Sequence, residues 1–292
     1  MLDFPIVDSH IHLIDRTRFS YSWSTGSSWA TAAPRLNRSW TADDLASYAK
    51  PYQVEGFVFV EADVDMPQYL AEAEWVADMA SNDSRIMGCV TCLPLELGPA
   101  IESEMARIAA LRPVRGIRRL IQNFSDSAII LQDNFVDGVN LLAKYNLSFD
   151  ICINHHQFEN ALELIRRCPD VTFILDHIGK PDIQADRFEP WHLHIHEVSR
   201  FPNVACKLSG VLTQANHASW TVDQVLPYIA HVVNCFGVDR VLFGGDWPVL
   251  ELASSYREWV DIVDQATDHL GASGKGKVFR DNAMRIYRLT RE

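Results

Sequence analysis

The sequence predicts a (β/α)8 barrel, and three observations support this fold class. Eight short apolar segments with strand character recur along the 292 residues, and helical patterns separate most of them. Strands that alternate with helices pair in parallel, and eight such units in about 250 residues are typical of a closed barrel. Histidines near the strands occur only at their carboxyl ends, where such barrels place their active sites. A doubly wound open sheet is the alternative, although no G-x-G-x-x-G motif follows the first strand.

The predicted elements run through the whole chain. We expect strands at residues 4–10, 54–61, 85–92, 114–119, 147–153, 171–177, 203–209 and 239–245. We expect helices at residues 68–81, 99–111, 134–145, 157–167, 221–236 and 254–270. Together these elements predict a single barrel domain over residues 1–292.

Residues 15–40 form a long connection after the first strand that is rich in Trp, Ser, Thr and Arg. Long loops in barrels usually have a function. Trp23, Trp29 and Trp40 are therefore candidates for the wall of a pocket that holds a sugar-like ring, because aromatic faces pack well against C–H surfaces. Packing of these tryptophans onto the barrel is the structural alternative, and the sequence leaves both open.

Composition excludes several classes of partner. The formal net charge of -12 and a pI near 5.3 argue against a nucleic-acid binder and against an anionic membrane surface. No stretch approaches the roughly 18 to 20 apolar residues of a membrane span, and we expect no secretory signal, because MLDFPIVDSH has no basic region followed by a long apolar run. The six cysteines lie mostly in apolar segments, so we expect buried free thiols and a cytoplasmic location.

The segment IVDSHIHLID, residues 6–15, places two histidines at the end of the first predicted strand. Strand side chains alternate between two faces, so Asp8, His10 and His12 are expected to point the same way. Two imidazoles on one face can bind one metal ion or one substrate. A pair of hydrogen-bonded core histidines is the alternative reading of this short motif.

Other strand ends supply further polar groups to the predicted mouth of the barrel. The sixth strand delivers His177 in FILDHIGKP, and the eighth delivers Asp246 in VLFGGDWPV. An aspartate opposite histidines can activate a water molecule, with or without a metal. In NVACKLSG the alternation points Lys207 into the barrel, where a charge needs a partner, and Glu61 or Asp246 is the expected one. Lys207 is then either a catalytic cation or half of a structural ion pair.

The segments VDSHIHL, GIRRL, LSFDICI, LDHIGKP, CKLSG and LFGGDWPV occur in this order from residue 7 to residue 249. With them the chain resembles the amidohydrolase superfamily, and within it most closely the sugar-lactone hydrolases that open fuconolactone- or rhamnonolactone-type rings. It resembles pyrone-dicarboxylate lactonase more distantly. The resemblance implies a hydrolase of a small-molecule sugar lactone in carbohydrate catabolism.

The resemblance also implies roles for individual residues. Asp246 would be the general base, with His177 and Arg118 as further catalytic groups, and Lys207 joins them as a candidate because the strand alternation points it inward. The expected substrate contacts are Trp29, Arg118, His155, His156 and Trp247. The sequence permits one zinc-like ion held by His10, His12 and either Glu61 or Asp246, and it equally permits a metal-independent enzyme. Two metals are not expected, because arginines stand where two-metal relatives carry a bridging lysine.

Two other functions remain as alternatives. A metal-dependent non-oxidative decarboxylase of the same superfamily shares the first-strand histidines, but HIGKPD replaces the glycine pair that commonly follows the sixth-strand histidine in those enzymes. A non-catalytic binding barrel is the third possibility. His192, His194 and His196 are expected on an outer helix, away from the mouth. Barrels of this type are often homo-oligomers, and no feature of the sequence fixes the state.

Overall fold

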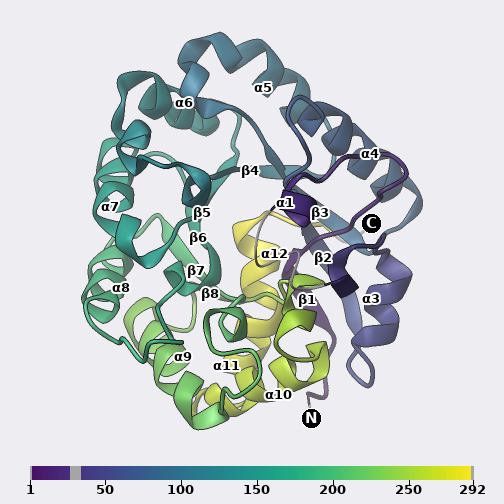
Figure 1. Cartoon of the computed structure of the whole chain (residues 1–292), viewed down its shortest axis with the longest axis vertical. Coiled ribbons are helices and arrows are strands. Elements are labelled where there is room, and N and C mark those ends of the chain that lie inside the picture. Colours follow the sequence, from purple (N-terminus) through teal and green to yellow (C-terminus); the bar gives the residue numbers. More distant parts are fainter. Residues whose placement is uncertain (1, 27–33, 291–292) are drawn as a thin grey trace.

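The computed structural model describes residues 2–26 and 34–290 and has the predicted (β/α)8 barrel fold (Figure 1). Its eight strands are β1 (Ile6–Ile11), β2 (Val54–Val60), β3 (Ile86–Cys92), β4 (Val114–Leu120), β5 (Ser148–Cys152), β6 (Phe173–Leu175), β7 (Val204–Leu208) and β8 (Val241–Phe243). Each strand pairs in parallel with the next in chain order. A parallel bridge between Ile11 and Trp247 brings the first strand to the segment after the last.

Most of the helices form a ring around the strands, and α12 lies inside this ring (Figure 1). The helices are α1 (Trp23–Gly26), α3 (Ala42–Tyr48), α4 (Tyr69–Asn82), α5 (Glu102–Ala109), α6 (Asp133–Lys144), α7 (Phe158–Arg167), α8 (Trp191–Ser199), α9 (Val222–Phe236), α10 (Tyr256–Ala266), α11 (Gly271–Gly276) and α12 (Asn282–Ile286). None of the helices in the described part of the chain is long and apolar enough to span a membrane.

Two strands end earlier than the sequence pattern predicts. β6 and β8 have three residues each, against the predicted ranges 171–177 and 239–245. After β6 the backbone of His177 turns into the left-handed region, and Asp246 after β8 does the same. The chain therefore leaves each strand at the point where a site residue begins to face the barrel mouth.

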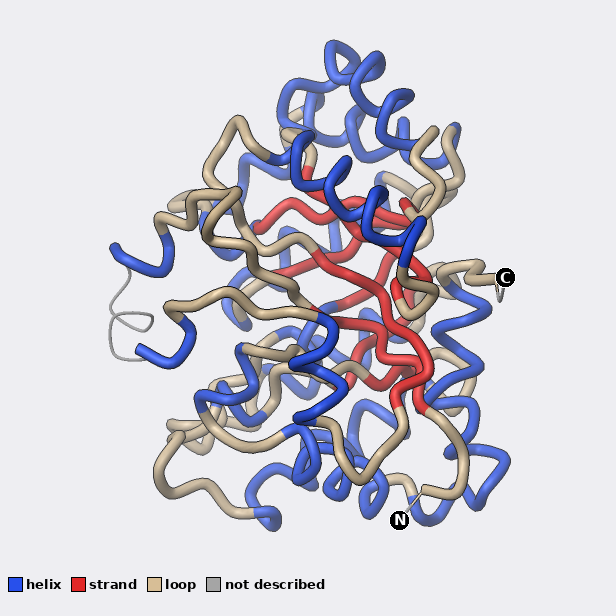
Figure 2. Tube along the Cα trace, turned by 90° about the vertical axis from the view of Figure 1, so that its right-hand side faces the viewer, coloured by secondary structure: helices blue, strands red, loops and turns tan. Residues whose placement is uncertain are grey.

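The half of the barrel interior that lies opposite the mouth is apolar. Inward side chains from the strands pack there against residues of the C-terminal segment, including Ala283, Ile286 and Leu289. In Figure 1 the helix α12 accordingly lies inside the ring of outer helices. Figure 2 shows the strands crossing the middle of the molecule, with both chain termini away from the long loops on the left. The C-terminal segment thus fills the end of the barrel that lies opposite the mouth.

A buried charge network separates this apolar layer from the mouth. Lys207 points into the barrel, as its alternation predicts, but its partners are not the expected Glu61 or Asp246. Its Nζ atom lies 2.6 Å from Asp150 Oδ2 and 2.9 Å from Asp176 Oδ1, and all three side chains are fully buried. The hydroxyl of Tyr287, which follows α12, donates a 2.5 Å hydrogen bond to Asp150. One ammonium therefore balances two carboxylates inside the barrel.

The Lys207→Met variant tests this balance. Removing one partner of a buried ion pair leaves uncompensated charge, so we expect the free energy of unfolding to fall by about 3–5 kcal/mol. Urea denaturation followed by circular dichroism measures this loss. Lys277→Met is the matched control, because Lys277 pairs with Asp239 at the exposed surface and such pairs contribute about 0–1 kcal/mol. A Lys207 variant no less stable than this control would contradict the assignment.

Candidate active site

A β-bulge in the first strand sets the direction of its two histidines. Asp8 pairs with Phe57 and Ile11 with Phe59, so three steps along β1 match two along β2. Such a bulge changes the phase of the alternation. Asp8 therefore does not share a face with His10, contrary to the simple alternation. It instead accepts hydrogen bonds from the Gly245 N–H and, at 2.7 Å, from the Tyr256 hydroxyl of α10.

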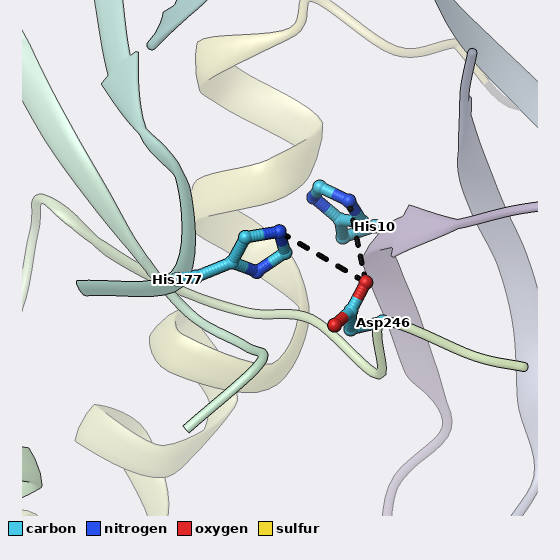
Figure 3. A group of neighbouring side chains, drawn as sticks. All are labelled: His10, His177 and Asp246. Carbon is cyan, nitrogen blue, oxygen red and sulfur yellow. Dashed lines mark ion pairs between the residues drawn. The ribbon is translucent and has the colours of Figure 1, made fainter. Parts of the chain in front are cut away.

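Three histidines converge on Asp246 at the floor of the mouth. The Nε2 atoms of His10, His12 and His177 lie 3.7, 3.4 and 3.9 Å from Asp246 Oδ1. Figure 3 shows His10 and His177 reaching the carboxylate from different parts of the barrel. The backbone N–H of Asp246 donates to the carbonyl of His10 at 2.8 Å, which fixes the segment after β8 against β1. The structure thus brings together four residues that sequence reasoning assigned to the site.

Neighbouring groups orient each imidazole. His12 Nδ1 lies 2.8 Å from the carbonyl oxygen of Val60. A carbonyl only accepts, so this nitrogen is the donor and Nε2 carries the lone pair. His177 Nδ1 lies 2.9 Å from the Ser209 hydroxyl. His10 Nδ1 lies 3.1 Å from Lys207 Nζ and 3.3 Å from Asp176 Oδ1.

Burial and charge set the protonation states in this cluster. Burial favours the neutral carboxyl of Asp246, but the neighbouring imidazoles of His177, His12 and His10 oppose it, and the pKa of Asp246 is held below its ordinary value. Burial lowers the pKa of His177 to about 4, although Asp246 and Asp176 counteract it. Burial and the charge of Lys207 also lower the pKa of His10 well below its ordinary range. At neutral pH the site therefore combines the Asp246 carboxylate with neutral imidazoles at His10 and His177.

The donor set fits one metal ion of the zinc type. Ligand atoms of His10, His177 and Asp246 all lie within 4.8 Å of one another. His12 Nε2 lies 3.2 Å from His10 Nε2. Tetrahedral zinc with bonds of about 2.0–2.1 Å requires ligand atoms roughly 3.3 Å apart, close to these separations. Imidazole lone pairs and a carboxylate are also the chemistry that zinc prefers.

Glu61, a predicted metal ligand, has other partners. Its Oε1 atom accepts a 2.6 Å bond from Arg118 Nε, and its Oε2 atom accepts a 2.7 Å bond from the Asp63 N–H. Arg118 also donates to the carbonyl of Glu61 at 2.7 Å and lies 3.4 Å from Asp176. Burial would lower the pKa of Arg118, but the surrounding carboxylates hold it well above its usual range. Glu61 therefore serves as the counter-ion that fixes Arg118 at the mouth.

A cavity of about 640 Å³ opens above the cluster, and its floor includes His12, Arg118, His177 and Asp246. Loops after β4 to β7 line it with side-chain amides, namely Gln122, Asn123, Asn154, Gln184 and Gln214. Loops after β1, β2 and β8 line it with apolar groups, namely Ile14, Leu36, Ala62, Val249 and Leu252. The two types of wall suit a ligand with many hydroxyl groups and a C–H surface.

Several predicted substrate contacts lie elsewhere. Trp247 is fully buried and packs against the rings of Trp40 and Tyr48 rather than lining the cavity. Asn154 lines the cavity, but His155 and His156, which follow it in the chain, do not. Trp29 lies outside the described residues.

The three histidines of PWHLHIHEV lie where the sequence predicts them, on the outer helix α8. His192 pairs there with Glu189, and His194 stacks on the ring of Phe158. These contacts place both imidazoles among groups of the helical layer and not at the barrel mouth.

Sequence reasoning missed three groups that the structure brings to the site. Asp150 holds Lys207, and the signal for it was a lone carboxylate within the apolar strand LSFDICI. Asp63 and Lys180 line the cavity two and three residues beyond Glu61 and His177. Burial and the charge of Glu61 raise the pKa of Asp63 to about 6. Asp63 and Lys180 both have left-handed backbone conformations, which the sequence does not reveal.

Comparison with known proteins places this site in a family. An L-fucono-1,5-lactonase of Burkholderia ambifaria is 31% identical over 224 residues, which cover 75% of this chain and 77% of that protein. An L-rhamnono-gamma-lactonase of Scheffersomyces stipitis is 23% identical over 344 residues, covering 99% of this chain and 100% of that one. The solved structure of an amidohydrolase from Burkholderia multivorans with bound zinc superposes with a TM-score of 0.86 at 25% identity, covering 98% of this chain and 100% of that one. The amidohydrolase family model matches residues 7–289, and the chain therefore belongs to the amidohydrolase family.

Proposed function

We propose that this protein hydrolyses the ester ring of a sugar-acid lactone of the L-fuconolactone or L-rhamnonolactone type, with Asp246 as the base that activates water. The observation that carries the proposal is the convergence of three histidine Nε2 atoms on the Asp246 carboxylate at the floor of the cavity. Relatives named for L-fucono-1,5-lactone and L-rhamnono-gamma-lactone hydrolysis support the substrate class. The amide-lined wall supports a ligand with many hydroxyl groups.

The chain's own residues account for the proton transfers. All three histidine contacts are made to Asp246 Oδ1, which leaves Oδ2 to accept a proton from water. The water oxygen then adds to the ester carbonyl carbon, and negative charge develops on the carbonyl oxygen. When the ring C–O bond breaks, the leaving ring oxygen takes up the proton that Asp246 holds. His177 and Arg118 line the cavity beside this carboxylate and orient the substrate oxygens.

Lys207 and the residues that could hold a metal ion lie beneath or at the floor of the cavity. Lys207 is a positioning residue in this proposal, because it contacts His10 and Asp176 beneath the cavity and does not line it. His10, His12, His177 and Asp246 would hold a single divalent ion, which supplies a Lewis acid when it is bound. Glu61 stays outside this set because Arg118 and the Asp63 N–H occupy its oxygens.

A panel of sugar lactones tests the proposed activity. We expect acid release above the spontaneous rate from at least one 1,4- or 1,5-lactone of fuconate, rhamnonate or a related aldonate, recorded with a pH indicator with and without chelator. A hydroxybenzoate panel scored for CO2 release provides the comparison. Decarboxylation together with no lactone opening would assign the site to the alternative chemistry of the superfamily.

Asp246→Asn tests the base. The substitution keeps the shape of the side chain and removes its basicity, and general-base catalysis typically contributes about a hundred- to ten-thousand-fold. We expect kcat on the best lactone to fall within that range while circular dichroism shows a folded protein. His196→Asn on the outer helix α8 is the control and should leave kcat unchanged, because this residue is exposed and far from the mouth. A folded Asp246 variant with most of its kcat would remove this residue from the mechanism.

Metal content tests the single-ion expectation. The second group of possible ligands, Cys152, Asp176 and His177, shares His177 with the first. In this second group the Asp176 carboxylate already pairs with Lys207 and Arg118. We therefore expect at most one zinc equivalent per chain after dialysis against zinc, measured by elemental analysis, and a lower content in His12→Gln than in His196→Gln. A content near two equivalents would refute the expectation.

A further inference from the structure

The cavity contains one positive charge that no carboxylate balances in the described part of the chain. Arg118 and Lys180 are the only arginine and lysine among the described residues that line it. Arg118 is paired with Glu61 at 2.6 Å and with Asp176 at 3.4 Å. The Lys180 ammonium instead donates a hydrogen bond to the amide oxygen of Gln122. A neutral amide leaves the charge of Lys180 free to attract an anionic ligand.

The backbone holds Lys180 at this place. Residues 177–180 all have left-handed φ values, of 54°, 50°, 71° and 49°. This conformation costs roughly 1–2 kcal/mol for each residue other than glycine, so it persists only because surrounding packing enforces it. A Cβ atom at Gly179 would meet the ring of Phe158 on α7 at 2.1 Å, which shows how closely the turn is packed. His177 and Lys180, at the two ends of this turn, both line the cavity.

Contacts link the ammonium to the reacting groups. The Gln122 amide oxygen that accepts from Lys180 also lies 3.4 Å from Cys152 Sγ. Ligand atoms of Cys152, Asp176 and His177 in turn lie within 4.8 Å of one another. The charge of Lys180 also contributes to the lowered pKa of His177. A ligand oxygen that replaces the Gln122 amide at Lys180 therefore lies on the His177 side of the cavity.

We propose that Lys180 binds the carboxylate of the ring-opened product and stabilises the carbonyl oxyanion that precedes it, which makes it a catalytic residue for lactone hydrolysis. This role rests on the proposed function. Water adds to the carbonyl carbon, the ring C–O bond breaks, the ring oxygen gains a proton, and the acid releases a proton to solvent. The substrate is neutral, and negative charge appears first on the carbonyl oxygen and remains on the product carboxylate. An unbalanced ammonium distinguishes these states from the neutral lactone.

Lys180→Met and Lys180→Arg, compared on the best lactone of the panel, test the role. One donor to an oxyanion is typically worth about a hundred- to a thousand-fold in kcat, and we expect a loss of that order in the methionine variant. A charge-assisted hydrogen bond corresponds to roughly ten- to a hundred-fold in affinity, so Ki for the ring-opened acid should rise by that factor. The KM for the neutral lactone should change about threefold or less, because the uncharged ground state interacts only weakly with the Lys180 ammonium. The arginine variant should recover most of both losses.

Two controls make the result decisive. Lys144→Met removes an exposed lysine on α6 that pairs with Glu102 on α5, and it should leave kcat and Ki unchanged. Raising the ionic strength should weaken inhibition of the wild-type enzyme by L-fuconate or L-rhamnonate, which tests the charge without any substitution. A methionine variant with wild-type kcat and Ki would overturn the role of Lys180 and leave lactone hydrolysis standing. A wild-type protein that opens no lactone would overturn both.

Discussion

The arrangement of the site depends on one lysine ammonium enclosed inside the barrel. Lys207 is fully buried, so its charge requires the carboxylates of Asp150 and Asp176. Asp150 is tied to Tyr287 at the C-terminal end of the chain, and Asp176 reaches His10 and Arg118. One buried charge thus couples the segment that fills the barrel to a histidine of the first strand. The orientation of His10 is a consequence of charge balance as much as of strand geometry.

The same network leaves an excess of negative charge beneath the mouth. Lys207 and Arg118 stand against four buried carboxylates: Glu61, Asp150, Asp176 and Asp246. The histidines do not offset this excess at neutral pH, because burial lowers the pKa of His10 and His177. Negative charge beside neutral imidazoles suits a cation. A single divalent ion among the histidines and Asp246 would balance the charge that the two buried cations leave.

The fold could be predicted from the sequence because it depends on local patterns. The alternation of apolar strands and amphipathic helices is visible residue by residue, and it locates all eight strands within a few positions. Side-chain direction in β7 followed from the same rule, and Lys207 does point inward. The rule failed in β1, where a bulge gives Asp8 and His10 different partners. A bulge arises from pairing with the neighbouring strand, which a single segment does not encode.

The partners within the site were harder to predict, because they depend on contacts distant in sequence. Asp150 precedes Lys207 by 57 residues and Tyr287 follows Asp150 by 137, so no spacing rule connects them. Trp247 was expected to contact the substrate, yet the turn that brings Asp246 to the cavity buries the tryptophan against Trp40. Adjacent residues of a tight turn point in different directions, and sequence proximity to a catalytic group is then misleading.

The cavity holds a carboxylate at its floor and an ammonium on its wall, and together they explain how one pocket can bind a neutral lactone and then hold the acid that forms from it. At the floor the neighbouring histidines hold the pKa of Asp246 below its ordinary value, so the base stays ionised, and its negative charge favours a neutral lactone over an anion. A product carboxylate is repelled by that floor, and the ammonium of Lys180 on the polar wall gives its charge a separate place. Asp246 contacts the three histidines and Lys180 contacts Gln122, so the two charges do not pair with each other in the described part of the chain. The carboxylate therefore stays available for water, and the ammonium stays available for the oxyanion and the acid that follows it.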